Sequence, residues 1–180
     1  MLKSKDNIII NIKSKKRYLG DNIMKENVNK ISTKIFLILI WMGFIFYLSH
    51  QPSSVSANQS GEFITMILNT PIIGSMLDSI LTSSIGEFII RKSAHMFLYF
   101  VLAILTFTYI ISIKNNRNSK YILKSITITL SLVFLYACSD EMHQLFIPGR
   151  SGEFRDVIVD TTGGAIGTIL ISIYYYYIKK

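Results

Sequence analysis

Residues 91–113 read RKSAHMFLYFVLAILTFTYIISI, and this stretch decides the fold of the chain. The apolar run from Ser93 to Ile113 is long enough to cross a bilayer as one helix, which takes about 20 residues. Two cations, Arg91 and Lys92, and the imidazole of His95 stand at the start of this run. Ionisable side chains at membrane depth are costly and usually face a partner, water or a ligand. The stretch therefore predicts a membrane helix with a polar site at one end.

Three further apolar runs have a similar length, in a chain whose mean hydropathy is +0.40. We predict an all-α integral membrane protein with four transmembrane helices, over about 32–49, 93–113, 122–138 and 157–178. These spans form one domain over residues 32–178, preceded by a flexible basic tail over residues 1–31. The first run could instead be a cleaved signal peptide, but the long segment before it favours an uncleaved anchor.

Basic residues give the predicted orientation. Nine of the 19 Lys and Arg residues lie in the first 34 positions, and three more lie in the connector 114–120. Residues 51–90 contain none. The positive-inside rule then places both termini and this connector in the cytoplasm, and the segments around 50–92 and 139–156 outside. We predict a multi-pass protein of the bacterial cytoplasmic membrane. The same distribution of the net charge of +8 argues against nucleic-acid binding.

The segment between the first two spans is not a simple polar loop. Apolar residues recur at helical spacing on both sides of Asn69-Thr70-Pro71. This pattern predicts short amphipathic helices at the membrane interface, with a re-entrant segment over residues 61–90 as the alternative. Cys138 is the only cysteine, which excludes an intrachain disulfide and metal sites built on several thiolates.

Polar residues at the outer ends of three spans recur every four positions, so each set shares a helix face. The sets are Arg91, His95 and Tyr99; Tyr136, Asp140 and Gln144; and Asp156 and Asp160. Gly163 and Gly167 let another helix approach closely. The turn at Pro148-Gly149 can fold Arg150 over the same region. We therefore predict an outward-facing polar pocket.

The residue types suggest two kinds of role. Candidate ligand-binding residues are Arg91, Lys92, Tyr99, Gln144, Arg150 and Asp156, since guanidinium groups bind phosphates and carboxylates bidentately. Candidate catalytic acid–base residues are His95, Asp140, Glu141 and Asp160. A hard cation on Asp140, Glu141 and Asp160 is a weak alternative, because no known ligand spacing occurs, and we predict neither a metal nor a cofactor. The simplest alternative is a set of ion pairs that locks the helices together.

This pattern of residues resembles the VanZ family. The matching residues are Ser49-x-Gln51, Arg91-Lys92-x-x-His95-x-x-x-Tyr99, Asp140-Glu141-x-x-Gln144, Pro148-Gly149-Arg150, Asp156-x-x-x-Asp160 and Gly163-Gly164. The resemblance runs from about Ile35 to Tyr177 and covers four spans in the same order. It implies a bacterial membrane protein linked to resistance to teicoplanin, a lipoglycopeptide that acts on cell-wall precursors outside the membrane.

Three functions remain as hypotheses. The first is an envelope protein whose pocket binds lipid headgroups or a lipid-linked cell-wall precursor and so influences teicoplanin susceptibility. The second is an intramembrane hydrolase or transferase that uses His95 and the carboxylates on a lipid-linked substrate. The third is a small proton-coupled carrier, which four short spans would form only as a homo-oligomer.

Overall fold

A computed structural model describes residues 26, 28–83, 85–114 and 118–178, which are mostly helical and include no strand. The predicted flexible tail, residues 1–31, lies almost entirely outside these residues. The helices are the N-terminal span (Val28–Ser49), α2 (Ser53–Leu68), α3 (Ile73–Leu81), α4 (Gly86–Lys114), α5 (Ser119–Gln144), α6 (Phe154–Ile173) and the π-helical η1 (Tyr174–Ile178). The chain is thus an all-helical protein, as predicted.

Four of these helices are long and apolar enough to cross a membrane: the N-terminal span, α4, α5, and α6 continued by η1. Two of them extend well past the predicted spans at the polar end. α4 begins at Gly86 instead of Ser93, and α5 ends at Gln144 instead of Cys138. An apolar run in the sequence ends at the first charged residue. A helix continues past that residue where its backbone and polar side chains have partners in the bundle. The polar residues before Ser93 and after Cys138 therefore lie on α4 and α5.

α6 packs against α4 through its glycines. A Cβ atom on Gly163 would collide with the backbone carbonyl of Met96, and one on Gly167 would lie 2.5 Å from the carbonyl oxygen of Phe100. Gly163 and Gly167 are one helical turn apart on α6, and Met96 and Phe100 are one turn apart on α4. The two helix backbones are therefore in direct contact, as small residues allow. This close approach places Asp160, one turn before the glycines, opposite His95.

The N-terminal span is held against α4 and α5 by two long-range hydrogen bonds. The indole Nε1 of Trp41 donates to the Leu98 carbonyl at 2.9 Å, and the Tyr136 hydroxyl donates to the Met42 carbonyl at 2.7 Å. At the other end of the bundle, a buried apolar cluster joins α4, α5 and η1 and consists of Phe107, Ile111, Ile122 and Tyr175. We call this cluster the closed end.

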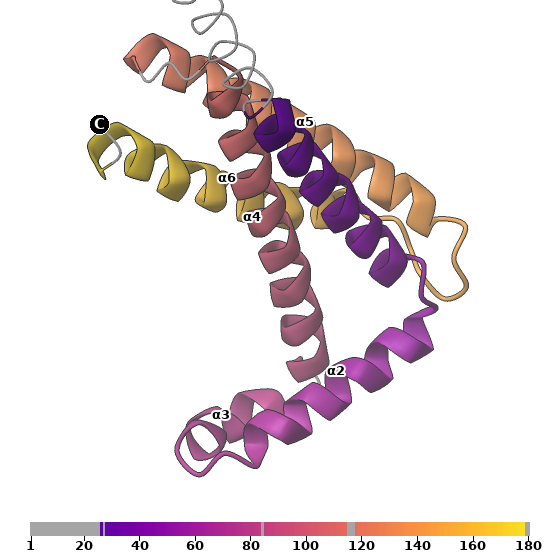
Figure 1. Ribbon diagram of the computed structural model, residues 1–180. Helices are drawn as coiled ribbons and strands as arrows, with labels where there is room; N and C mark the ends of the chain where they lie inside the picture. Colours follow the sequence, from indigo (N-terminus) through magenta and orange to yellow (C-terminus); the bar gives the residue numbers. More distant parts are fainter. Residues whose placement is uncertain (1–25, 27, 84, 115–117, 179–180) are drawn as a thin grey trace, which may run out of the picture.

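α2 and α3 lie across one end of the bundle, beside the start of α4, as the magenta and pink helices in Figure 1 show. Both are too short to span a bilayer. They expose large apolar side chains, including Phe63, Met66, Ile73 and Met76. Two short amphipathic helices are present as predicted, and their interfacial position stays a prediction.

Candidate functional site

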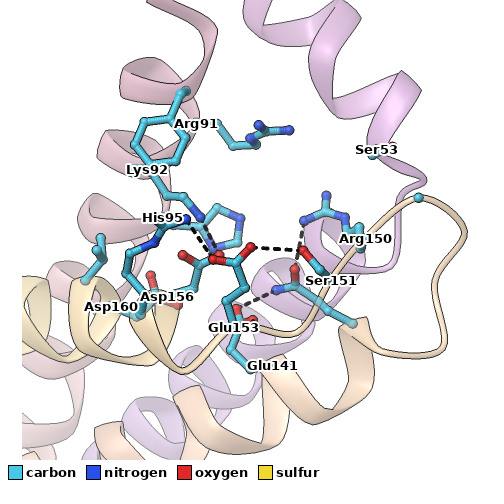
Figure 2. Close-up of a pocket in the computed structure, with 15 residues that line it drawn as sticks. Ser53, Arg91, Lys92, His95, Glu141, Arg150, Ser151, Glu153, Asp156 and Asp160 are labelled. Atoms are coloured by element: carbon cyan, nitrogen blue, oxygen red, sulfur yellow. Dashed lines mark hydrogen bonds and ion pairs between the residues drawn. The ribbon is translucent and has the colours of Figure 1, made fainter. Parts of the chain in front are cut away.

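A cavity of about 250 Å³ opens at the polar end of the bundle. Its walls come from α4, the end of α5, the α5–α6 loop, the start of α6 and Ser53 on α2 (Figure 2). The lining residues are Ser53, Phe88, Arg91, Lys92, His95, Glu141, Gln144, Gly149, Arg150, Ser151, Glu153, Arg155, Asp156, Val159 and Asp160. We call this space the polar cavity.

A tight turn places Arg150 in the polar cavity. The Arg150 N–H donates to the Ile147 carbonyl at 3.1 Å, with Pro148 and Gly149 between them. Gly149 has a φ of +74°, which fits the third position of a type II turn and favours glycine there. The Pro148 carbonyl also accepts from the Ser53 N–H at 3.3 Å, which joins the turn to α2.

The Arg150 guanidinium is held by neutral oxygens rather than by a carboxylate. It donates to the carbonyls of Leu48 (3.2 Å) and Gln51 (2.8 Å) and to Gln144 Oε1 (3.2 Å). Burial lowers the pKa of Arg150, and the positive charge of Arg91 lowers it further. Arg91 itself makes no hydrogen bond or ion pair within the described part of the chain. Both guanidinium groups line one cavity, and neither forms an ion pair within the described residues, although Asp140, Glu141 and Asp156 attract Arg150 from a greater distance (Figure 2).

The other two cations of the cavity are paired. Lys92 forms an ion pair with Asp156, and both side chains are largely buried. Arg155 pairs with Glu153 at 2.7 Å on the exposed rim. The Phe88 ring lies 5.3 Å from the Lys92 ammonium and 5.6 Å from the Arg155 guanidinium, within the range of cation–π attraction. These pairs leave Arg91 and Arg150 as the groups able to receive an anion.

A hydrogen-bond network fixes the carboxylates at the end of α5. The Gln144 side-chain amide donates to Glu141 Oε1 at 3.0 Å and to Asp140 Oδ2 at 3.2 Å. Glu141 Oε2 accepts from the Glu153 N–H at 3.0 Å, and Asp140 Oδ2 accepts from the Ser49 hydroxyl at 2.7 Å. Both oxygens of Glu141 are thus partnered, but only one oxygen of Asp140 is.

His95, Asp140 and Asp160 converge at the inner wall of the polar cavity. His95 Nδ1 lies 3.8 Å from Asp160 Oδ2, and one ligand atom from each of the three residues lies within 4.8 Å of the other two. Asp140 is 3 % exposed and Asp160 1 % exposed. Asp140 Oδ1 and Asp160 Oδ2 are buried without a hydrogen-bond partner in the described structure.

A second, apolar space of about 410 Å³ adjoins the polar cavity between α2 and α4. It is lined by Leu48, Ser56, Gln59, Ser60, Phe63, Ile90, Arg91, Ala94, His95, Phe97 and Leu98. Arg91 and His95 line both spaces, so the two spaces lie on either side of these side chains. We call the second space the apolar groove.

The structure brings together most of the residues predicted for the site. Those that line the polar cavity are Arg91, Lys92, His95, Glu141, Gln144, Arg150, Asp156 and Asp160. Tyr99 and Asp140 do not line it; both are buried behind it. Their predicted roles as ligand-binding and catalytic residues are not tested by this arrangement.

The contributors to the site that sequence reasoning missed include Ser49, Gln51, Phe88 and Glu153. Ser49 and Gln51 occur in the pattern shared with the VanZ family and could have been found there. Phe88 carried no signal, because it lies before the predicted start of its span. Glu153 donates its backbone N–H to Glu141, a role that no side-chain pattern reveals, and its carboxylate pairs with Arg155 on the rim.

A family model described as VanZ/LLP1 matches residues 34–175 of the chain. No curated protein and no solved structure gave a match.

Proposed function

The chain belongs to the VanZ/LLP1 family, and from this premise we propose that it binds an amphiphile of the bacterial envelope by its phosphate headgroup. The headgroup would lie in the polar cavity between Arg91 and Arg150, and the apolar tail would lie in the groove. A phospholipid and a lipid-linked cell-wall precursor share this chemistry.

The observation that carries the proposal is the pair of guanidinium groups without a carboxylate partner. Arg91 and Arg150 line the same cavity and repel each other. An anion between them would stabilise both, and guanidinium groups match the geometry of phosphate oxygens. Lys92 is less suited to this, because Asp156 already balances its charge.

The apolar groove supports an amphiphile rather than a free anion. It shares Arg91 and His95 with the polar cavity, so a molecule held at Arg91 can extend into either space. Its walls include Phe63 on α2 and Phe97 on α4, both more than half exposed. Apolar side chains of this kind suit an acyl or isoprenoid chain.

Arg91→Ala provides the cleanest test, because Arg91 makes no hydrogen bond to any described residue that its loss would break. We expect this variant to weaken phospholipid retention, measured by native mass spectrometry of the full-length protein, by about ten-fold or more. Arg155→Ala is the matched control, since this arginine is paired on the exposed rim and should change retention far less. Equal retention by the wild type and Arg91→Ala would overturn the proposal.

Separate arms of this experiment identify which amphiphile the protein binds. Vesicles of anionic phospholipid, vesicles of zwitterionic phospholipid and an undecaprenyl diphosphate-linked precursor would each be offered to the protein. Preferential retention of the precursor would identify a role in the wall pathway, and retention of the phospholipids alone would identify a lipid-binding role.

We further propose that the site faces outward and that binding there influences teicoplanin susceptibility, as the resemblance to the VanZ family implies. A cysteine at Ser54 or Ser151, in a Cys138→Ala background, should be labelled by an impermeant reagent in intact cells. Protection of both positions would overturn the orientation. Cells that express the wild type should differ in teicoplanin susceptibility from cells that express Arg91→Ala.

An acid–base enzyme is the second candidate function, favoured by His95 and Asp160 at the wall of the polar cavity. His95 Nδ1 is 3.8 Å from the Asp160 carboxylate, close enough for that carboxylate to orient the imidazole after a small movement. His95→Gln separates the two functions. It should abolish turnover of a lipid-linked substrate in an enzyme, whereas a binding protein should keep most of its lipid retention.

A further inference from the structure

The buried cluster of His95, Asp140 and Asp160 holds two carboxylates, and within the described residues only one of them has a cationic partner at ion-pair distance. Within the described residues, the single ion pair of these two carboxylates is the one between Asp160 and His95. One imidazolium can balance one carboxylate at most. Burying the second charge without compensation is costly, and such groups usually gain a counter-charge or a proton.

Two buried carboxylate oxygens of this cluster have no hydrogen-bond partner among the described residues. Asp140 Oδ1 and Asp160 Oδ2 belong to side chains that are at least nine-tenths buried, yet neither accepts a hydrogen bond. The Tyr99 hydroxyl, one turn beyond His95 on α4, is also buried without a partner. Buried polar atoms are nearly always satisfied, so atoms with no hydrogen-bond partner in the chain usually meet a water or an ion.

The hydrogen bonds of one Asp140 carboxylate oxygen resemble those that orient a metal-binding carboxylate. Its Oδ2 accepts from the Ser49 hydroxyl and from the Gln144 amide, and this leaves Oδ1 free. Outer hydrogen bonds of this kind orient the carboxylate ligands of metal ions. Glu141 differs, because both of its oxygens are occupied by protein donors.

We propose that His95, Asp140 and Asp160 bind one divalent first-row transition-metal ion, with Zn²⁺ or Mn²⁺ as the best-suited class. One imidazole nitrogen and two carboxylate oxygens suit these ions. The three ligand atoms lie within 4.8 Å of one another, so small side-chain movements bring all three to coordination distance.

The ion would be reachable from the polar cavity, because His95 and Asp160 line it. Three protein ligands leave at least one coordination position open. A phosphate oxygen held by Arg91 and Arg150 could fill that position. The metal site does not depend on headgroup binding, but it does exclude the use of a coordinated His95 nitrogen as a general base.

The test uses the full-length protein purified in detergent without a chelator. We expect about one equivalent of metal by elemental mass spectrometry. After treatment with EDTA, adding Zn²⁺ or Mn²⁺ should raise the Tm by about 5 °C. Asp160→Asn and His95→Gln should lose both the bound metal and this rise in Tm.

Two controls address ions bound elsewhere. Glu141→Gln should keep the metal, since the Glu141 oxygens are already partnered. His50→Gln should also keep it, and this variant removes the pair of His50 and His143, whose ring nitrogens lie 3.1 Å apart near the surface. If either control loses the metal as fully as His95→Gln, the ligand assignment is wrong.

A spectroscopic readout keeps the proposal testable if the variants do not fold. Mn²⁺ added to the metal-free wild type should show electron–nuclear coupling to a histidine nitrogen. A wild type that takes up neither ion, or a Tm that EDTA and added metal leave unchanged, would overturn the proposal. Arg91→Ala should keep the metal while it loses lipid, so failure of one proposal is distinguishable from failure of the other.

Discussion

The two ends of the same helix bundle differ in the polar groups that they bury and in the hydrogen bonds of those groups. At the closed end, the Tyr121 hydroxyl donates to the Ile110 carbonyl at 2.9 Å, and Ser125 donates to its own helix at 2.8 Å. At the polar end, Asp140 Oδ1 and Asp160 Oδ2 are buried without a hydrogen-bond partner among the described residues. A bundle that needed only stability would satisfy both ends. This difference supports the proposal that the polar end binds a ligand.

The largest effect on the fold should come from separating α4 and α6, on which the polar end depends. Gly163→Leu should destabilise the protein by about 3 kcal/mol, because the new side chain has no room beside the Met96 backbone. Thermal unfolding in detergent measures this effect. Gly43→Leu is the control, since a Cβ at Gly43 meets no atom within 4 Å. Similar losses in both variants would contradict the close α4–α6 packing.

A core truncation at the closed end should separate stability from ligand binding. Phe107→Ala should lower the free energy of unfolding by about 2 kcal/mol, because a fully buried ring loses its packing against Tyr175 and its neighbours. Lipid retention by the folded variant should not change. Phe36→Ala removes a ring that is 62 % exposed and should have little effect on stability. A loss of lipid retention in Phe107→Ala would show that the two ends are coupled.

Two buried serines, one at each end of the bundle, allow the stability contributions of the two ends to be compared. Ser49 and Ser125 are both fully buried, but Ser49 donates to the Asp140 carboxylate whereas Ser125 donates to a carbonyl of its own helix. Ser49→Ala should cost about 1 kcal/mol more than Ser125→Ala, because a buried carboxylate loses a donor. Chemical denaturation of the two variants measures the difference, and equal costs would remove the contrast between the ends.

The smallest effect on stability should come from Arg91→Ala, although its effect on lipid retention is large. With no partner to lose, this change should alter the free energy of unfolding by no more than about 0.5 kcal/mol. Lys92→Ala is the neighbouring control and should destabilise the protein clearly more, because it leaves the largely buried Asp156 carboxylate without its cationic partner. Thermal unfolding of both variants provides the comparison. A marked loss of stability in Arg91→Ala would mean that Arg91 serves the fold rather than a ligand.

The sequence predicted the four spans but not where their polar ends stop. Hydropathy ended the third span at Cys138, whereas α5 continues to Gln144 because Asp140, Glu141 and Gln144 satisfy one another and their neighbours. Spacing by four correctly grouped His95 with Arg91, which line the same cavity. It also grouped Tyr99 with them, but one further turn carries that side chain into the buried core.

The sequence by itself determined the helical membrane fold, the close approach at Gly163 and Gly167, and which polar residues gather at one end of the bundle. These follow from local patterns of length, hydropathy and spacing, which act within single helices. Only the tertiary structure decided which charges are paired and which are not. Asp156 pairs with Lys92, and Asp140 and Asp160 come from different helices to meet His95. Such pairings depend on how far each helix is rotated and shifted against its neighbours, and no pattern within one helix records that.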